Sequence, residues 1–188
     1  MNLNILATIN RNHFLGNKYT VFIGSETSAA YSSEISFSFK EPNSIDLFGQ
    51  NGGDSIWLTL VENLKRPAFD VSIGKRPVTT PIGRLSVLGN SVKPHLRISS
   101  TSSADHFEIK ESNAFLSIIR SYGPIKMFMP NSYSITNSKS EVVGRVKEIY
   151  SVVLGCSVRV FIDSTRIRDS ERPLLVAAAV YISVNPSL

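Results

Sequence analysis

Apolar and polar residues alternate along most of the chain in short runs that Gly, Pro, Asn and Ser separate. At residues 69–73 and 107–109 every second residue is apolar, the pattern of a strand with one buried face. Similar β-favouring runs cover residues 5–12, 19–23, 35–39, 56–61, 82–88, 96–98, 115–119, 125–129, 142–149 and 158–162. The pattern predicts a mainly β protein of about a dozen strands.

Turn-forming residues mark the connections between these runs. Asn51-Gly52-Gly53-Asp54 separates two apolar runs, at residues 45–48 and 56–60, and predicts a hairpin turn because such residues tolerate positive φ. Residues 26–33 and 99–103 are rich in small and hydroxyl side chains. We expect both to be surface loops.

A helix signal exceeds the strand signal only at residues 169–184. Ser170 or Asp169 could cap a helix there, Pro173 suits its first turn, and three alanines follow. Residues 174–182 carry no polar group except the phenol of Tyr181, so protein must surround this helix on every side. A helix of about 12 residues reaches only ~18 Å, too short to span a bilayer. A buried strand is the alternative.

Residues 15–25 and 154–164 resemble each other, with six of eleven positions identical. Each copy follows a strand-like run, which predicts two similar hairpins near the chain ends; chance similarity between strands is the alternative. Such hairpins suit a closed barrel in which the first and last strands meet. A barrel of more than eight strands has interior room that the apolar helix could fill. We therefore predict one domain over residues 1–188, a closed antiparallel β-barrel of about a dozen strands around a hydrophobic C-terminal helix.

Composition and charge restrict the possible partners. The single cysteine, Cys156, excludes an internal disulfide, and the first residues lack the basic and apolar regions of a signal peptide, which predicts a cytoplasmic protein. The 20 Lys and Arg exceed the 15 Asp and Glu, so the net charge of +5 is compatible with anionic lipid or nucleic acid. Interleaved basic and aromatic residues are too few to predict nucleic-acid binding.

Catalytic and metal-binding patterns are weak. His13, His95 and His106 have no metal-ligand spacing, and neither a nucleophile-elbow motif nor a P-loop occurs. We expect no enzyme, no cofactor and no metal site.

One acidic segment could be interpreted as a calcium site. The oxygen-bearing residues Asp163, Thr165, Asp169 and Glu171 lie between the last predicted strand and the helix, but the central glycine of a calcium loop is missing and Arg166 and Arg168 intervene. Helix capping is the alternative explanation for these carboxylates.

Three motifs resemble those of one protein family. Residues 14–22, FLGNKYTVF, are similar to the tubby strand motif F-L-G-T-K-F-T-V-Y. Residues 83–86 and 91–93, GRLS and SVK, are similar to the tubby signature G-R-V-T-x-A-S-V-K-N-F, with two extra residues and without the final N-F. Residues 143–147, 154–155 and 158–162 with the apolar helix are similar to the closing segment of scramblase and LURP-one-related domains.

The chain thus resembles the tubby C-terminal-like superfamily, which includes tubby proteins, phospholipid scramblases and LURP-one-related proteins. The resemblance covers both ends and part of the middle of the chain, although the tubby C-terminal signature ending in A-C-E is absent. It implies a barrel of about a dozen strands wrapped on a C-terminal helix.

The resemblance also implies a lipid site. In tubby proteins a Lys and an Arg two residues apart, before the F-L-G turn, hold a phosphoinositide headgroup, and the corresponding segment here keeps at most Arg11. The second copy of the repeated unit has this spacing in Arg145 and Lys147, which would project from one strand face and could bind phosphate together. The alternative is a solvated strand face paired with Glu141 or Glu148.

We therefore predict a non-enzymatic module of tubby-like type that binds phosphoinositide or another anionic lipid, or a protein partner, at the inner membrane surface. Its predicted headgroup site comprises Arg145, Lys147, Arg11 and Lys18, and we expect no transmembrane segment. The alternative is a structural or assembly protein with an all-β sandwich, such as a coat or scaffold subunit.

Overall fold

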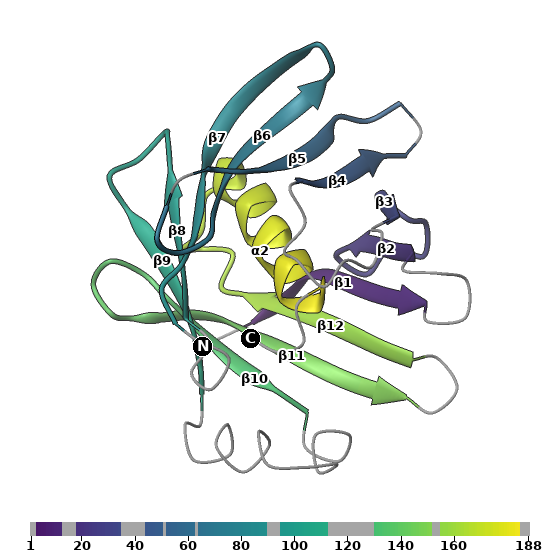
Figure 1. The fold of residues 1–188 in the computed structure, drawn as a ribbon. Helices are drawn as coiled ribbons and strands as arrows, with labels where there is room; N and C mark the ends of the chain where they lie inside the picture. The colour runs from purple at the N-terminus through teal and green to yellow at the C-terminus, as the bar shows by residue number, and fades with distance from the viewer. Residues whose placement is uncertain are drawn as a thin grey trace.

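A ring of hydrogen-bonded strands surrounds one helix (Figure 1). The computed structural model describes residues 3–12, 18–34, 44–50, 52–62, 64–89, 95–112, 130–151 and 155–184. The strands are β1 (Asn4–Asn12), β2 (Lys18–Ile23), β3 (Tyr31–Glu34), β4 (Ser44–Gly49), β5 (Ser55–Leu60), β6 (Ala68–Lys75), β7 (Val78–Val87), β8 (His95–Ser100), β9 (His106–Glu111), β10 (Ser132–Thr136), β11 (Val142–Ser151) and β12 (Gly155–Ile162). A 3-10 turn, η2 (Asp169–Glu171), leads into helix α2 (Arg172–Val184).

The ring closes where β1 pairs with β12, and every other strand pairs with its sequence neighbours in antiparallel fashion. The β1–β2 and β11–β12 hairpins are the two copies of the repeated unit, and they lie side by side through this pair. The closed barrel of 12 described strands confirms the predicted fold class. The two stacked sheets of the alternative sandwich are not what these strands form.

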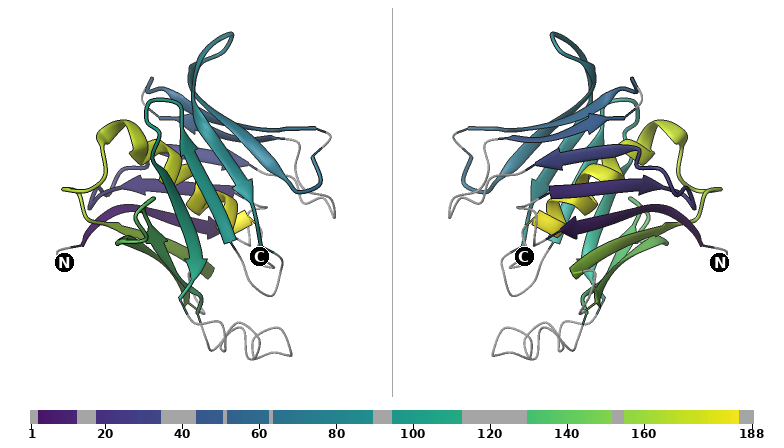
Figure 2. Two further views of the ribbon diagram at one scale, coloured as in Figure 1. Left: turned by 90° about the vertical axis from the view of Figure 1, so that its left-hand side faces the viewer. Right: turned by 90° about the vertical axis from the view of Figure 1, so that its right-hand side faces the viewer.

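Helix α2 fills the interior of the ring, as two further views show (Figure 2). Its residues from Leu174 to Ser183 are all buried, and Ala177 and Ala178 have no exposed surface. A helix with its side chains is about 10–12 Å across, which suits the lumen of a barrel larger than eight strands. The predicted helix is confirmed, and the alternative of a buried strand is wrong.

Inward-facing side chains of the strands complete this core. On β4 buried residues alternate with less buried ones, as the period of two requires, whereas on β5 the first four residues are all buried. Phe69 of β6 meets Tyr181 of the helix, with ring centroids 5.1 Å apart. The apolar inward-facing side chains of the strands therefore pack against the apolar helix, and each buries the other.

Glu171 holds the start of the helix, in place of the predicted caps Ser170 and Asp169. Its buried carboxylate accepts hydrogen bonds from the Arg168 backbone N–H at 3.0 Å and from the Ser103 hydroxyl at 3.3 Å. A carboxylate at this position satisfies an N–H group that has no partner within the helix. The contact with Ser103 also ties the helix entrance to the β8–β9 turn.

Two strands were not predicted from the sequence pattern. β3 lies largely inside the predicted loop at residues 26–33, and β10 was not predicted at all. Both are short and rich in serine, and the hydrogen-bonding edges of their neighbours complete them. The predicted strands at 35–39, 115–119 and 125–129 lie outside the described residues. The predicted β4–β5 hairpin is confirmed, with Gly52 at φ +79°.

A glycine on β7 makes a test of this packing. A methyl group on Gly83 would collide with the Ser99 carbonyl oxygen and lie 2.9 Å from Leu174 Cδ2. We expect Gly83→Ala to lower the free energy of unfolding, measured in urea, by about 1–3 kcal/mol, because backbone cannot yield without breaking strand pairing. Gly53→Ala is the control, since its methyl would meet only the Gln50 carbonyl oxygen, at 3.2 Å. Equal losses in both variants would contradict the close approach of helix and strand.

Candidate functional site

Arg145 and Lys147 project from the outer face of β11. Both side chains are exposed, whereas Val146 and Glu148, which alternate with them, are buried. Residues two apart on a strand are separated by about 6.7 Å. The structure therefore places these two predicted cations side by side on the outside of the barrel.

A third cation, Arg159 of β12, completes the group. It is exposed and lies directly opposite Lys147 in the β11–β12 ladder, while Phe161 lies opposite Arg145. Opposed Cα atoms in such a ladder are about 5 Å apart. The Lys147 Nζ sits 5.9 Å from the centre of the Phe161 ring. We call Arg145, Lys147 and Arg159 the outer cationic face.

The carboxylates that could have neutralised this face are engaged elsewhere. Glu148 points into the barrel and accepts a hydrogen bond from Asn131 Nδ2 at 2.6 Å, and Glu141 lies 3.4 Å from Arg166. Across the described residues, no cation of the outer cationic face forms an ion pair. The alternative in which Glu141 or Glu148 pairs with Arg145 and Lys147 is therefore not what the structure has.

The other two predicted residues lie apart from this face. Arg11 is buried, and its guanidinium lies 5.7 Å from the centre of the Tyr19 ring. Lys18 is exposed at the start of β2, four residues from Phe22, which shares the cross-strand row of Arg159. Four strand residues span roughly 13 Å. Arg11 faces the interior, and Lys18 is too distant to share a phosphate group with the other three.

A separate cluster on β8 and β9 contains basic residues that do form ion pairs. Glu108 lies 2.8 Å from Arg97, 2.5 Å from Lys110, 3.3 Å from His95 and 3.9 Å from His106. Hydrogen bonds from Lys110 and Arg97 lower the pKa of Glu108 to about 2. Arg97 and Lys110 thus flank a negative charge, unlike the cations of the outer cationic face. Sequence spacing places His106, Glu108 and Lys110 on one face of β9, and strand register brings Arg97 and His95 beside them.

The acidic segment before the helix is held by the protein's own donors. Asp163 Oδ1 accepts hydrogen bonds from the hydroxyl and the backbone N–H of Thr165, and these lower the pKa of its carboxyl group. Asp169 lies 2.8 Å from Arg172, and Glu171 holds the start of the helix. No three His, Cys, Asp or Glu side chains in the described part of the chain converge as metal ligands would.

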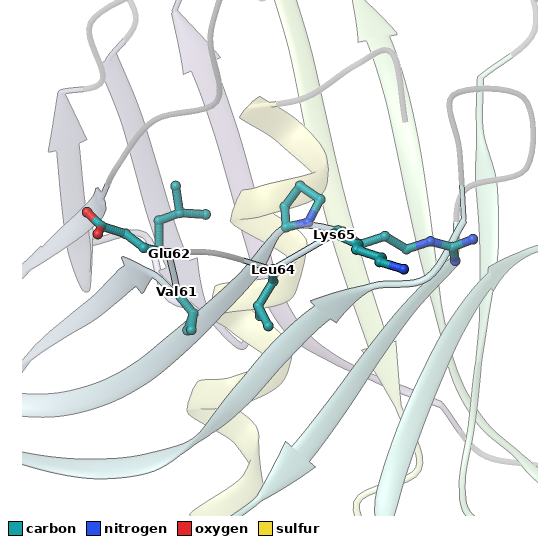
Figure 3. Close-up of a pocket in the computed structure, with 7 residues that line it drawn as sticks. Val61, Glu62, Leu64 and Lys65 are labelled. Carbon is teal, nitrogen blue, oxygen red and sulfur yellow. The ribbon is translucent and has the colours of Figure 1, made fainter.

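A pocket of about 530 Å³ lies at the β5–β6 loop (Figure 3). Its lining residues are Leu60, Val61, Glu62, Leu64, Lys65, Arg66 and Pro67. Arg66 is tied to the Leu88 carbonyl oxygen, and Glu62 and Lys65 lie on different sides of the loop. The charged groups do not converge on one point, and none of the predicted site residues lines this pocket.

Comparisons with models of known protein families, with curated proteins and with solved structures find no match. Membership of the tubby-like superfamily therefore stays a prediction from the sequence motifs. Over the residues described, no helix combines the length and the apolar character needed to cross a membrane.

The opposed cations of the outer cationic face carry a cost in stability. Like charges directly across an antiparallel pair repel, so Arg159→Gln is expected to raise the free energy of unfolding by about 0.5 kcal/mol. Arg84→Gln is the matched control, because Arg84 lies 2.7 Å from Asp70 on the neighbouring strand and its loss should lower stability. Urea denaturation at low salt measures both. A loss of stability in Arg159→Gln would show that this side chain has a compensating partner.

Glu108 makes the stability depend on pH. Because its pKa in the folded protein, about 2, lies below the ordinary value, its charge stabilises the fold above about pH 4.5 and ceases to as pH falls toward 2. We expect Glu108→Gln to cost about 1 kcal/mol at pH 5, a difference that shrinks toward pH 2. Urea titrations of both proteins across this range measure it. A difference that is constant with pH would contradict the assigned ion pairs.

Proposed function

We propose that this protein is a non-enzymatic module of tubby-like type that binds phosphorylated headgroups of anionic lipids, including phosphoinositides, at the cytoplasmic surface of a membrane. The observation that carries the proposal is the outer cationic face, where Arg145, Lys147 and Arg159 gather with no ion pair to a carboxylate in the described chain. Arg11 and Lys18 are not part of the proposed site.

Neighbouring groups suit a phosphate ligand. Ser134 lies opposite Arg145, Ser132 lies opposite Lys147, and Thr8 lies opposite Arg159. Hydroxyl groups donate to phosphate oxygens, and guanidinium groups bind them in a bidentate manner. The site thus offers several donors and presents no acidic side chain in these positions.

Three cations supply a useful attraction. Each Lys or Arg near an anionic membrane surface contributes about 1 kcal/mol, so three contribute roughly a hundredfold in partitioning. A group of mutually repelling, solvent-exposed cations gains a favourable partner when phosphate is present. This gain supports a binding role over a solely structural one.

Vesicle sedimentation tests the proposal. We expect binding to phosphatidylcholine vesicles that contain a phosphatidylinositol phosphate or phosphatidylserine, and little binding to phosphatidylcholine alone. Replacing both Arg145→Ala and Lys147→Ala should lower the partition coefficient about 30-fold, because two of the three attractions are lost. Vesicles matched in surface charge show whether the phosphoinositide is preferred.

The matched control is Lys65→Ala with Lys75→Ala, which removes the same charge from exposed positions on the opposite side of the ring. Its partition coefficient should stay within a few-fold of the unsubstituted protein. Equal weakening by both double variants would mean that net charge alone drives binding, and the absence of binding by the unsubstituted protein would refute the proposal.

A further inference from the structure

Exposed apolar side chains gather around the outer cationic face. Within the described chain the exposed large hydrophobic residues are Ile5, Phe48, Leu64, Val78, Val142 and Ile149. Three of these six lie on β1 or β11, the two strands that flank β12. Strand β11 thus carries both cations and exposed apolar groups, and β1 adds an exposed apolar group on the other side of β12.

A bulge in β1 turns one of these side chains outward. Ile5 pairs with Phe161 and Ala7 pairs with Val160, so Leu6 is an extra residue in the ladder. Leu6 and Ala7 are both buried, and Ile5 is 38% exposed. With strict alternation from Ala7, Ile5 would point into the barrel; the bulge places it beside Phe161 on the outside instead.

A second bulge does the same in β11. Ile135 pairs with Gly144 and Thr136 pairs with Val142, so Val143 is the extra residue. Val143 and Gly144 are both buried, and Val142 is 40% exposed. Two bulges, one on each side of β12, therefore expose an aliphatic side chain that regular alternation would have directed to the core.

Two apolar side chains, exposed Ile5 and half-buried Phe161, lie next to the cations in the strand ladder. Phe161 lies between Ile5 and Arg145 in one cross-strand row, and its ring supports the ammonium group of Lys147 at 5.9 Å. We call Ile5, Phe161 and Val142 the apolar rim. The rim and the outer cationic face both lie on the outer side of β1, β12 and β11, with Val142 three residues from Arg145 along β11.

We infer that this surface docks flat on an anionic bilayer, with the apolar rim inserted among the lipid headgroups while the cations bind phosphate. The inference rests on the proposed function and adds which side of the barrel contacts the membrane. Interfacial binding combines buried apolar area with attraction to anionic lipid, and one weak signal alone gives only marginal membrane binding. A pairing of rim and cations supplies both signals.

The chemistry favours a lipid surface over a protein surface. Long cationic side chains beside apolar groups suit the boundary between headgroups and acyl chains. A soluble phosphate would satisfy the cations but would leave the rim exposed. The lipid bilayer is the partner that satisfies both parts.

The single tryptophan provides a built-in reference for testing the orientation. Trp57 lies on β5, across the ring from β12, and Arg76 covers its ring at 4.2 Å. Ile5→Trp and Val142→Trp, made separately, should give fluorescence that lipids brominated on their acyl chains quench. Val78→Trp, at a position 78% exposed on the opposite side, is the control and should remain unquenched, as should the unsubstituted protein.

A second pair of variants tests the contribution to affinity. Replacing Ile5→Ser and Val142→Ser together should weaken partitioning to phosphatidylserine vesicles roughly tenfold, because apolar contact is lost while all cations remain. Leu64→Ser with Val78→Ser, both more exposed in the native fold, should leave it unchanged. Thermal unfolding curves confirm that each variant folds.

The possible outcomes separate the two proposals. If Ile5→Trp and Val142→Trp stay unquenched on vesicles that still bind the protein, the docking orientation is overturned while the proposed lipid binding stands. Quenching of Val78→Trp instead would place the β7 side of the barrel on the membrane and would also overturn the docking orientation. If the unsubstituted protein does not bind vesicles at all, the proposed function fails, and the docking inference fails with it.

Discussion

Burial of one apolar helix is the constraint on which the whole structure depends. Helix α2 has no polar face, so it is stable in water only if protein encloses it completely. A ring of 12 described strands provides that enclosure, and the ring in turn needs the helix to occupy its lumen. Neither element has a satisfactory structure without the other, and the inward faces of the strands are given over to this contact.

The outside of the barrel is consequently the surface that remains for contact with other molecules. Because alternate strand residues point inward to the helix, the intervening residues are free to carry charge, and on β11 and β12 they carry three cations. The two bulges beside β12 depart from this division by sending Ile5 and Val142 outward. A surface that is both basic and apolar results from local irregularities in an otherwise regular ladder.

The sequence allowed the architecture to be predicted because its main signals are local. Alternation, turn residues and the uninterrupted apolar helix are visible in short windows, and the repeated unit indicated which strands close the ring. β3 and β10 were not predicted, because their serine-rich segments form strands only through hydrogen bonds to the edges of neighbouring strands. At the site, spacing alone put Arg145 and Lys147 on one face. Arg159, the inward position of Arg11 and the bulges all depend on register between distant strands, which no short window contains.

Closure between β1 and β12 has a consequence for how the barrel is made. Strand β1 is translated first, yet its β12 partner and the central helix belong to the last part of the described chain. During synthesis the barrel cannot close until the C-terminal segment has left the ribosome. Until then β1 lacks its β12 partner and no helix occupies the interior. Long-range strand pairing of this kind slows folding, and the unpaired strand edges stay exposed while folding is incomplete. Exposed strand edges and apolar surface of this kind make folding intermediates prone to aggregation.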